Sequence, residues 1–341
     1  MDRALYGEDG FYSRGEGAVG HFRTSACAAV SVLEIFAAAL GELLGRVDTA
    51  LGHPAALDLV DVGGGSGELL TAVADSVGPQ IQARIRPCVV ERRAAPPDLP
   101  PYVRWLDRVP DLTGLLIANE WLDNVALDVA AANGWFGYAA AGECGTATVM
   151  LVDRTGAESL GLAPTQEEAA WLERWWPSGA RREIGLSRDI AWGSAVSHVR
   201  RGLAVAMDYA HTAEDRPAYG TLTGFRSGRQ IEPIPDGSCD LTAHVAIDSV
   251  AAAGEAAAAA TGVAAGAAGS RSVRTLLTDQ RTALQLLGVS GRRPDYAADR
   301  GGYAAALQRA GDAAELIDPA GLGAFAWLLQ GIDLDPAALL H

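Results

Sequence analysis

The stretch LDLVDVGGGSG at residues 57–67 decides the fold of this protein. It opens as a short apolar run of Leu and Val, which is typical of a buried strand, and it closes in glycines, which permit a tight turn. The next residues, ELLTAVADSVG at 68–78, carry apolar side chains at helical spacing. A strand, a glycine turn and a helix in this order predict the opening of a parallel α/β unit.

Further apolar runs predict the rest of the sheet. They lie at residues 86–90, 102–106, 115–118 and 203–207, with helical or loop-like segments between them. Strands that alternate with helices favour a doubly wound, Rossmann-like α/β sheet, in which ligands bind at the carboxyl ends of the strands. A helical segment at 25–46 is expected before the first strand.

The pattern of apolar runs changes after residue 128, where further strands, helices and a loop are predicted. Residues 135–138 and 146–152 are typical of a β-hairpin, helices are expected near 165–176 and 187–200, and residues 210–242 form a long polar loop. Tail helices are expected near 246–260, 279–287 and 296–309, with an apolar segment at 325–329.

These expectations divide the chain into three predicted parts. They are an N-terminal loop and helix (1–56) covering the ligand site, a core (57–128 and 201–341), and an inserted β-hairpin and helical subdomain (129–200).

Charge and composition limit the partners. The chain has 27 basic residues, all of them arginine, against 42 acidic ones, so its formal net charge is −15. Such a surface repels nucleic acid and anionic membranes and tolerates a cationic substrate. The absence of lysine also excludes a Schiff base and a Walker lysine.

The cysteines and the N-terminus indicate a cytoplasmic protein. The four cysteines are far apart and form no C-x-x-C pair, so neither a disulfide framework nor a cysteine metal site is expected. Residues 1–14 lack the apolar region of a signal peptide, and no run of about 20 strongly apolar residues occurs. The histidine spacing predicts no metal site either.

The glycine turn fits one nucleotide-binding pattern better than another. The dinucleotide fingerprint G-x-G-x-x-G, counted from Gly63, needs a glycine where Glu68 stands. The methyltransferase pattern acidic-x-G-x-G-x-G is met in full. The turn residues expected to bind S-adenosylmethionine are Asp61, Gly63, Gly64, Gly65 and Gly67.

Other polar residues at strand ends complete the predicted cofactor site. Glu91 ends the next strand and is expected to accept both ribose hydroxyls, and Asp107 after the third strand could meet the adenine amino group. Asn119 at the end of the fourth strand and Thr24 before the first helix are the remaining candidates. The expected cofactor is S-adenosyl-L-methionine, with S-adenosyl-L-homocysteine as the product.

Several segments beyond the turn resemble one family. They are GHFRT (20–24), LLIANEWLDNV (115–125), AMDYAH (206–211), DLTAHV (240–245), TDQRTALQLLGV (278–289) and LIDPAGLGAF (316–325). With them the chain resembles a divergent, actinobacterial-type member of the MidA family, methyltransferases related to a mitochondrial complex I assembly factor that methylates arginine. The chain departs from the family at His21, where the family usually has aspartate, and at Val125-Ala126, where it favours proline.

The resemblance implies N-methylation of a side chain in a peptide or protein, with arginine as acceptor and histidine or an amine as alternatives. A guanidinium is always protonated in proteins, so its methylation needs carboxylates that localise charge and accept a proton. The candidate catalytic residues are Glu120, Asp123, Tyr209 and His211. The candidate acceptor-binding residues are His21, Asp208, Asp240 and His244.

Interpretations in which these residues have a purely structural role compete with these assignments. Asp240 and His244 share one face of a helix if the segment is helical, where they would form a cap and a packing pair. Two alternative functions also stay open: a small-molecule, natural-product or modified-peptide methyltransferase, and a non-catalytic S-adenosylmethionine-binding assembly factor. Formation of an oligomer is compatible with the sequence.

Overall fold

The computed structural model describes residues 1–13, 30–132, 147–264, 271–296 and 301–341. The chain forms two compact units. The small-sheet unit consists of Met1–Phe22, Leu122–Trp192 and Tyr209–Ala253. The main-sheet unit consists of Arg23–Trp121, Gly193–Asp208 and Gly254–His341.

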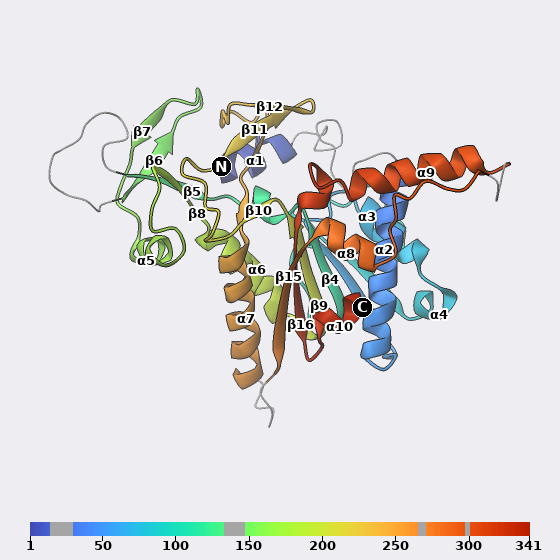
Figure 1. Ribbon diagram of the computed structural model, residues 1–341. Coiled ribbons are helices and arrows are strands. Elements are labelled where there is room, and N and C mark those ends of the chain that lie inside the picture. The colour runs from blue at the N-terminus through green and yellow to red at the C-terminus, as the bar shows by residue number, and fades with distance from the viewer. Residues whose placement is uncertain (14–29, 133–146, 265–270, 297–300) are drawn as a thin grey trace. The chain divides into compact units, whose positions relative to one another are not determined.

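In the described part of the main-sheet unit, seven strands form one sheet in the order β15-β16-β9-β4-β1-β2-β3 (Figure 1). Their bounds are β1 Leu57–Val62, β2 Ile85–Val90, β3 Arg104–Leu106, β4 Leu112–Asn119, β9 Val199–Asp208, β15 Val273–Asp279 and β16 Ala326–Ile332. β16 runs antiparallel to both of its neighbours, and the other neighbouring pairs are parallel. Strands β2 and β3 extend the sheet on one side of β1, and β4 and β9 extend it on the other. The chain order therefore reverses between β1 and β4, where doubly wound sheets bind ligands.

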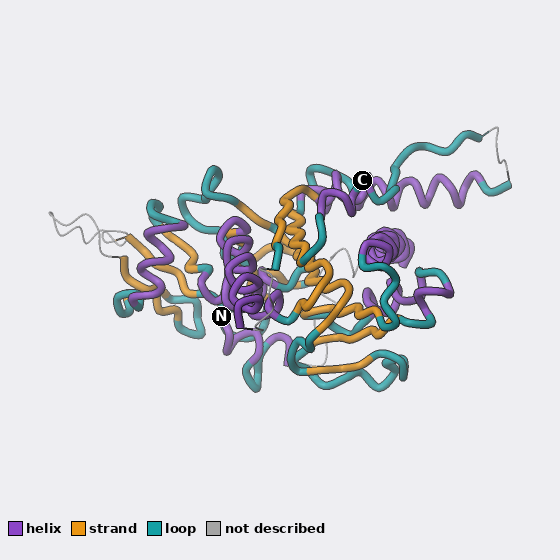
Figure 2. Tube along the Cα trace, turned by 90° about the horizontal axis from the view of Figure 1, so that it is seen from below, coloured by secondary structure: helices purple, strands orange, loops and turns teal. Residues whose placement is uncertain are grey.

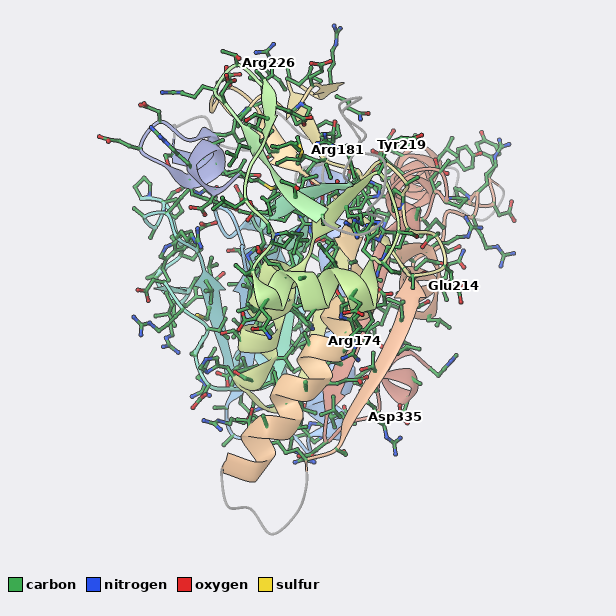
Figure 3. The ribbon with its side chains drawn as sticks, turned by 90° about the vertical axis from the view of Figure 1, so that its left-hand side faces the viewer. Arg174, Arg181, Glu214, Tyr219, Arg226 and Asp335 are labelled. Atoms are coloured by element: carbon green, nitrogen blue, oxygen red, sulfur yellow. The ribbon has the colours of Figure 1, made fainter. Side chains whose placement is uncertain are left out.

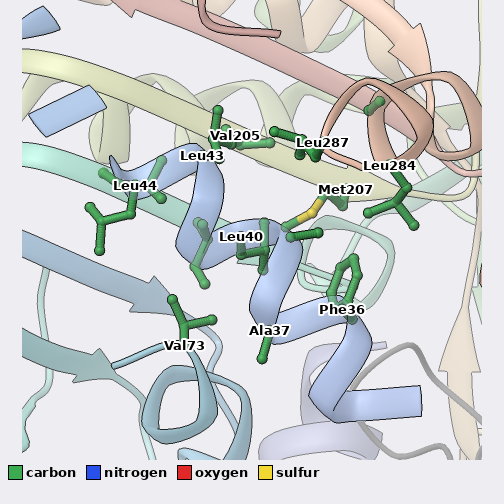
Figure 4. Close-up of a cluster of buried hydrophobic side chains, with 14 of the residues drawn as sticks. Phe36, Ala37, Leu40, Leu43, Leu44, Val73, Val205, Met207, Leu284 and Leu287 are labelled. Atoms are coloured by element: carbon green, nitrogen blue, oxygen red, sulfur yellow. The ribbon is translucent and has the colours of Figure 1, made fainter. Parts of the chain in front are cut away.

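The main-sheet unit also contains helices, several of which pack on the sheet through apolar faces. They are α2 Val30–Ala50, α3 Glu68–Ser76, α4 Pro79–Gln82, α8 Gln280–Leu286, α9 Tyr303–Leu316 and α10 Pro336–Leu340, with a 3-10 turn at Leu322–Ala324. Figure 2 views the molecule from below, so that α2 appears end-on beside the strands. Phe36 and Leu40 of α2 are fully buried in one cluster with Val205 and Met207 of β9 (Figure 4). Each such apolar side chain contributes about 1.5–3 kcal/mol by leaving water.

The small-sheet unit contains a four-stranded sheet in the order β7-β6-β5-β8. Its elements are β5 Asp128–Ala132, β6 Ala147–Val152, β7 Glu158–Leu160, β8 Arg181–Ile184 and the helix α5 Gln166–Trp175. Thr165 and Glu168 begin α5 with a reciprocal capping box. Arg181, labelled in Figure 3, forms an ion pair of 2.7 Å with Glu158.

The rest of this unit is built from short elements. They are α1 Asp2–Tyr6, the 3-10 turns Phe11–Ser13 and Leu122–Asn124, β10 Ala210–His211, β11 Thr223–Arg226, β12 Arg229–Ile231, β13 Asp240–Thr242 and β14 Val245–Ala246. Strands β12, β11 and β13 form an antiparallel sheet, and β10 pairs with β14 in parallel. The helices α6 Leu186–Ser197 and α7 Ile247–Ala264 each contribute to both units.

The predicted fold class, a doubly wound α/β methyltransferase fold, is confirmed by this architecture and by the structural relatives described below. Some local predictions were wrong. The expected polar loop at 210–242 contains four strands, β15 was not predicted, and the helix expected at 296–309 is observed at 303–316. The strand expected at 135–138 lies outside the described residues. The three-part division of the chain stays a prediction.

None of the described helices combines the length and the apolar character that crossing a bilayer would require.

Candidate active site

The glycine turn after β1 is held in a conformation that side chains disfavour. Gly63, Gly65 and Gly67 have φ angles of +72°, +60° and +88°. The Gly63 N–H donates to the carbonyl of Val90 at 2.9 Å, which ties the turn to β2, and the Gly67 N–H donates to the carbonyl of Gly64 at 2.8 Å. Glycine adopts these left-handed angles without the clash of a Cβ, so the turn needs glycine at three positions.

Two glycines are also required by neighbouring side chains of the protein. A Cβ on Gly63 would overlap Cδ1 of Trp121 and lie 2.9 Å from its Cγ. A Cβ on Gly64 would lie 2.7 Å from Oδ2 of Asp61. These two positions are filled from within the chain, so their lack of side chains leaves no room for a ligand.

Gly65 differs from the other glycines of the turn. Among the described residues other than its two chain neighbours, the only heavy atom within 4 Å of a Cβ built on Gly65 is Nη2 of Arg93, at 3.9 Å. At Gly67 such a Cβ would lie 3.3 Å from both Leu99 and Val89. Gly65 is therefore the part of the turn whose bare backbone faces open space, where a ligand could approach closely.

Asp61, the penultimate residue of β1, has a deeply buried carboxyl group. The residue as a whole is only 2% exposed. Burial, followed by the negative charges of Glu91 and Glu68, raises the pKa of Asp61 to about 8. A bound cation beside this carboxyl would favour its ionised form, so the residue suits an ammonium ligand.

Glu91 directly follows β2 and is anchored by the backbone. Its N–H donates to the carbonyl of Leu106 at 3.0 Å, and its Oε1 accepts hydrogen bonds from the N–H groups of Arg92 at 2.7 Å and Arg93 at 3.2 Å. Its Oε2 lies 3.5 Å from the Arg93 guanidinium. Asp107 differs, because its side chain is 78% exposed and is paired with the exposed Arg108. The structure thus orients Glu91, while solvent surrounds Asp107.

The end of β4 carries backbone strain. Glu120 has φ +51°, which is uncommon for a residue with a side chain, and its N–H donates to the carbonyl of Met207 at 2.8 Å. The side-chain amide of Asn119 donates to Oε1 of Glu120 at 3.2 Å, while its buried Oδ1 accepts no hydrogen bond from the described residues. Asp208, at the end of β9, is fully buried. Strained residues and unsatisfied polar atoms cluster at functional sites.

Two carboxyl groups are buried near each other in the small-sheet unit. Asp123 accepts a hydrogen bond from the hydroxyl of Thr242 at 2.7 Å, and Asn124 donates to both carboxylate oxygens of Asp240 at 3.2 and 3.3 Å. Burial raises the pKa of Asp123. Burial and then the charge of Asp123 raise the pKa of Asp240 to about 7. The charge of Asp123 therefore favours the proton on Asp240, and a cation placed beside Asp240 would oppose that preference.

The N-terminal residues contribute a phenol to this pair. The hydroxyl of Tyr12 donates to Oδ1 of Asn124 at 3.0 Å, and Tyr12 stacks on Tyr6 with ring centroids 5.5 Å apart. Burial, followed by the charge of Asp240, raises the pKa of Tyr12 well above its usual value. Tyr12 is therefore a neutral hydrogen-bond donor beside the two carboxyl groups.

Arg188 of α6 holds the segments that carry these residues. It is only 1% exposed. Its guanidinium donates to the carbonyls of Asp123 at 2.5 Å, Ala243 at 2.8 Å, His244 at 3.0 Å and Val125 at 3.1 Å. One planar cation thus joins the segment after β4 to the segment between β13 and β14.

Tyr209 and His244 form an exposed pair. Ala210 and Val245 are directly opposite in the parallel pairing of β10 and β14, so the residues before them lie side by side. The rings of Tyr209 and His244 are stacked, with centroids 5.6 Å apart and planes 19° apart. The helical interpretation of residues 240–244 was wrong, because Asp240 lies in β13 and His244 precedes β14.

His211 is buried rather than displayed to solvent. Its Nδ1 lies 2.6 Å from Nη1 of Arg216, and its ring packs edge-on against Trp176 with centroids 5.0 Å apart. A guanidinium can only donate, so Nδ1 accepts and Nε2 carries the proton. Burial, followed by the charge of Arg216, lowers the pKa of His211 to about 4. His211 is neutral near pH 7 and a weak base.

The structure thus assembles the predicted residues in separate groups. The main-sheet unit contains the glycine turn, Asp61, Glu91, Asn119 and Glu120, and the small-sheet unit contains the remaining described candidates for catalysis and acceptor binding, apart from Asp208. His21 and Thr24 lie outside the described residues.

Three residues of these groups were not predicted. Trp121 lies inside the N-E-x-x-D motif, so its position was a usable signal, whereas Tyr12 and Arg188 belong to no motif of the sequence. Arg188 becomes recognisable only when four carbonyls from two distant segments surround it.

A mostly parallel sheet with one antiparallel strand, and a glycine turn after an acidic residue at its switch point, define the class I methyltransferase fold. Residues 39–264 match the family described as "Putative S-adenosyl-L-methionine-dependent methyltransferase", and the chain belongs to that family. The protein is therefore an S-adenosylmethionine-dependent methyltransferase, with S-adenosyl-L-methionine as its cofactor.

Solved structures share the fold over nearly the whole chain. One is a "likely methyl transferase" from Burkholderia thailandensis bound to S-adenosyl-homocysteine, with 22% identity, a TM-score of 0.73, and coverage of 98% of this chain and 87% of that chain. Another is a native structure of an uncharacterized protein from the same organism, with 22% identity, a TM-score of 0.75, and coverage of 100% and 88%. No curated protein matches this chain significantly.

Proposed function

We propose that this methyltransferase is a MidA-type enzyme that methylates a nitrogen on a side chain of a peptide or protein, with arginine as the leading acceptor. The observation that carries the proposal is the buried carboxyl pair of Asp123 and Asp240. Burial raises the free energy needed to ionise each carboxyl, and a cationic acceptor would offset that cost.

The residues of the main-sheet unit fit the cofactor. The bare backbone of Gly65 suits close approach, the buried Asp61 suits the methionine ammonium, and Glu91 is oriented to accept from the ribose hydroxyls. Asp107 and Asn119 would contact the adenosine and methionine ends, and the relative bound to S-adenosyl-homocysteine supports this use of the fold. When bound, the cofactor supplies an electrophilic methyl group on its sulfonium.

The acceptor must present an uncharged nitrogen in line with that methyl group. In the proposed reaction the nitrogen forms a bond to the methyl carbon while the carbon–sulfur bond breaks and its electron pair goes to sulfur. The proton of the nitrogen goes to a carboxylate, for which we propose Glu120 with Asp123 in support. Asp208, Asp240 and His244 would bind the acceptor, and Tyr209 and His211 would shape its site.

Cofactor binding is tested by calorimetry with S-adenosylhomocysteine. Gly65→Val and Glu91→Ala should each weaken binding at least tenfold, because they fill the open side of the turn and remove the acceptor of the ribose hydroxyls. Glu255→Ala, at an exposed position of α7, is the control and should bind like the wild type. Undiminished binding in both site variants would refute the proposed cofactor site.

Acceptor chemistry is tested by mass spectrometry after incubation of a lysate and of synthetic peptides with isotope-labelled cofactor. We expect label on arginine side chains, and loss of the label with Asp240→Asn. Label on histidine or lysine side chains would retain a peptide acceptor but exclude arginine. Label only on small molecules would establish the natural-product alternative, which the departures at His21 and Val125-Ala126 favour.

A further inference from the structure

We propose that Trp121 is a specificity-determining residue that makes the cofactor site bind cationic S-adenosylmethionine in preference to the neutral product. The proposal rests on the proposed cofactor site. It goes further because it assigns the discrimination between cofactor and product to one aromatic side chain. The motif N-E-x-x-D leaves the residue at this position unspecified.

The backbone directs Trp121 onto the glycine turn. Glu120 turns the chain with its left-handed φ of +51°, and its N–H is anchored at 2.8 Å on the carbonyl of Met207. The next residue, Trp121, thereby places Cδ1 and Cγ of its indole where a side chain on Gly63 would lie. The missing side chain of Gly63 thus serves the indole, and only Gly65 in this turn faces open space.

This contact lies at the switch point of the sheet. Gly63 follows β1 and Trp121 follows the end of β4, and β1 and β4 are the neighbouring strands between which the chain order reverses. Ligands of doubly wound sheets bind in the crevice at the carboxyl ends of these strands. An indole that joins the two strand ends therefore forms a wall of that crevice.

Carboxyl groups and one guanidinium lie near this wall. The negative charges of Glu91 and Glu68 contribute to the raised pKa of the nearby Asp61, and the guanidinium of Arg93 lies 3.5 Å from Glu91. The face of an indole adds attraction for a cation through its quadrupole.

Cofactor and product differ in the charge on their sulfur atom, to which such a site would respond. S-adenosylmethionine carries a positively charged sulfonium, and S-adenosylhomocysteine carries a neutral thioether that is otherwise the same apart from one methyl group. An indole beside the sulfur would therefore strengthen cofactor binding and leave product binding nearly unchanged. This preference would let S-adenosylmethionine displace S-adenosylhomocysteine at a lower cofactor concentration.

The test compares the dissociation constants of both ligands by calorimetry in the wild type, Trp121→Phe and Trp121→Leu. Trp121→Leu should weaken S-adenosylmethionine binding about two- to fivefold while S-adenosylhomocysteine binding changes less than twofold. Trp121→Phe should keep most of the ratio. Trp175→Leu is the control, since Trp175 is a half-buried tryptophan of the small-sheet unit that already carries Arg174 over its ring at 4.7 Å.

A spectroscopic measurement accompanies the affinities. Addition of S-adenosylmethionine should change tryptophan emission in the wild type and in Trp175→Leu but much less in Trp121→Phe, although the heat of binding persists there. If Trp121→Leu weakened the binding of both ligands equally, or weakened the binding of neither, the proposal would be overturned while the cofactor site stayed intact. Failure of the wild type to bind either ligand would instead refute the cofactor site, and the role of Trp121 with it.

Discussion

Oδ2 of Asp61 lies 2.7 Å from the point that a Cβ on Gly64 would occupy. The buried carboxyl and the bare backbone of the turn therefore depend on each other: the acid fits under the turn because residue 64 lacks a side chain. Gly65, one residue further, has no such internal neighbour and faces open space.

This contrast predicts different effects of two alanine substitutions. Gly64→Ala should reduce the free energy of unfolding by about 1–3 kcal/mol, because the new methyl group displaces the Asp61 carboxyl. Gly65→Ala should cost about 1–2 kcal/mol from its left-handed φ alone, yet weaken S-adenosylhomocysteine binding at least as strongly as Gly64→Ala does. Urea unfolding and calorimetry on both variants measure this. Full ligand affinity in Gly65→Ala would show that the open side of the turn is not the ligand side.

The raised pKa of Asp61 predicts a pH-dependent stability. In the unfolded chain this carboxyl ionises near pH 4, and in the folded protein near pH 8, so between these values the folded state holds a proton that the unfolded state has lost. The contribution of Asp61 to stability is therefore complete below about pH 4 and is lost as the pH rises through 8. Asp61→Asn cannot ionise, so its stability relative to the wild type should increase steadily from pH 5 to pH 8 in urea unfolding. Parallel stability curves would contradict the raised pKa.

The same carboxyl predicts a pH dependence of binding. If the ionised Asp61 contacts the methionine ammonium, binding below pH 8 requires loss of the proton, so affinity for S-adenosylhomocysteine should rise as the pH is raised from 6 to 8. Calorimetry in two buffers of different ionisation heat should detect the released proton. Asp61→Asn should bind more weakly and show no such release.

Glu120 combines a strained backbone with a proposed catalytic carboxylate, and two substitutions separate these properties. Glu120→Gly should raise the free energy of unfolding by up to about 1 kcal/mol, because glycine relieves the φ of +51°. Glu120→Gln should leave the strain in place. Both variants should lower the rate of methyl transfer about 100-fold or more if the carboxylate accepts the proton. Full transfer by Glu120→Gln would exclude that role.

Arg188 joins two segments through four carbonyl groups, so its removal should be costly. Arg188→Met should reduce the free energy of unfolding by at least about 3 kcal/mol, because buried carbonyls lose a charged donor. Arg188→Lys should restore little, since an ammonium cannot reproduce the planar fork. Arg226→Met, at an exposed position labelled in Figure 3, is the matched control and should be nearly neutral. A small effect of Arg188→Met would show that the segments hold together without it.

Local patterns were sufficient for the central features of the fold. The stretch at 57–78 folds as β1, a turn and α3, as predicted, because an apolar run, positive-φ glycines and helical spacing act over a few neighbouring residues. Non-local pairing defeated the same approach at β15, which becomes a strand only through β16, far away in the chain. At 210–242 the strand β13 pairs with β11 across a longer separation, whereas β11 and β12 form a local hairpin around Ser227-Gly228, a turn signal that the sequence analysis missed.

The sequence by itself determined the fold class, the methyltransferase family and the cofactor, because a spaced motif of glycines and acids is readable without tertiary contacts. Only the tertiary structure decided which glycine faces open space, which carboxyls hold a proton, and that Arg188 and Trp121 support the segments around them. Burial, electrostatic coupling and close contact depend on distances between residues that are remote in sequence, and those distances exist only once the chain has folded.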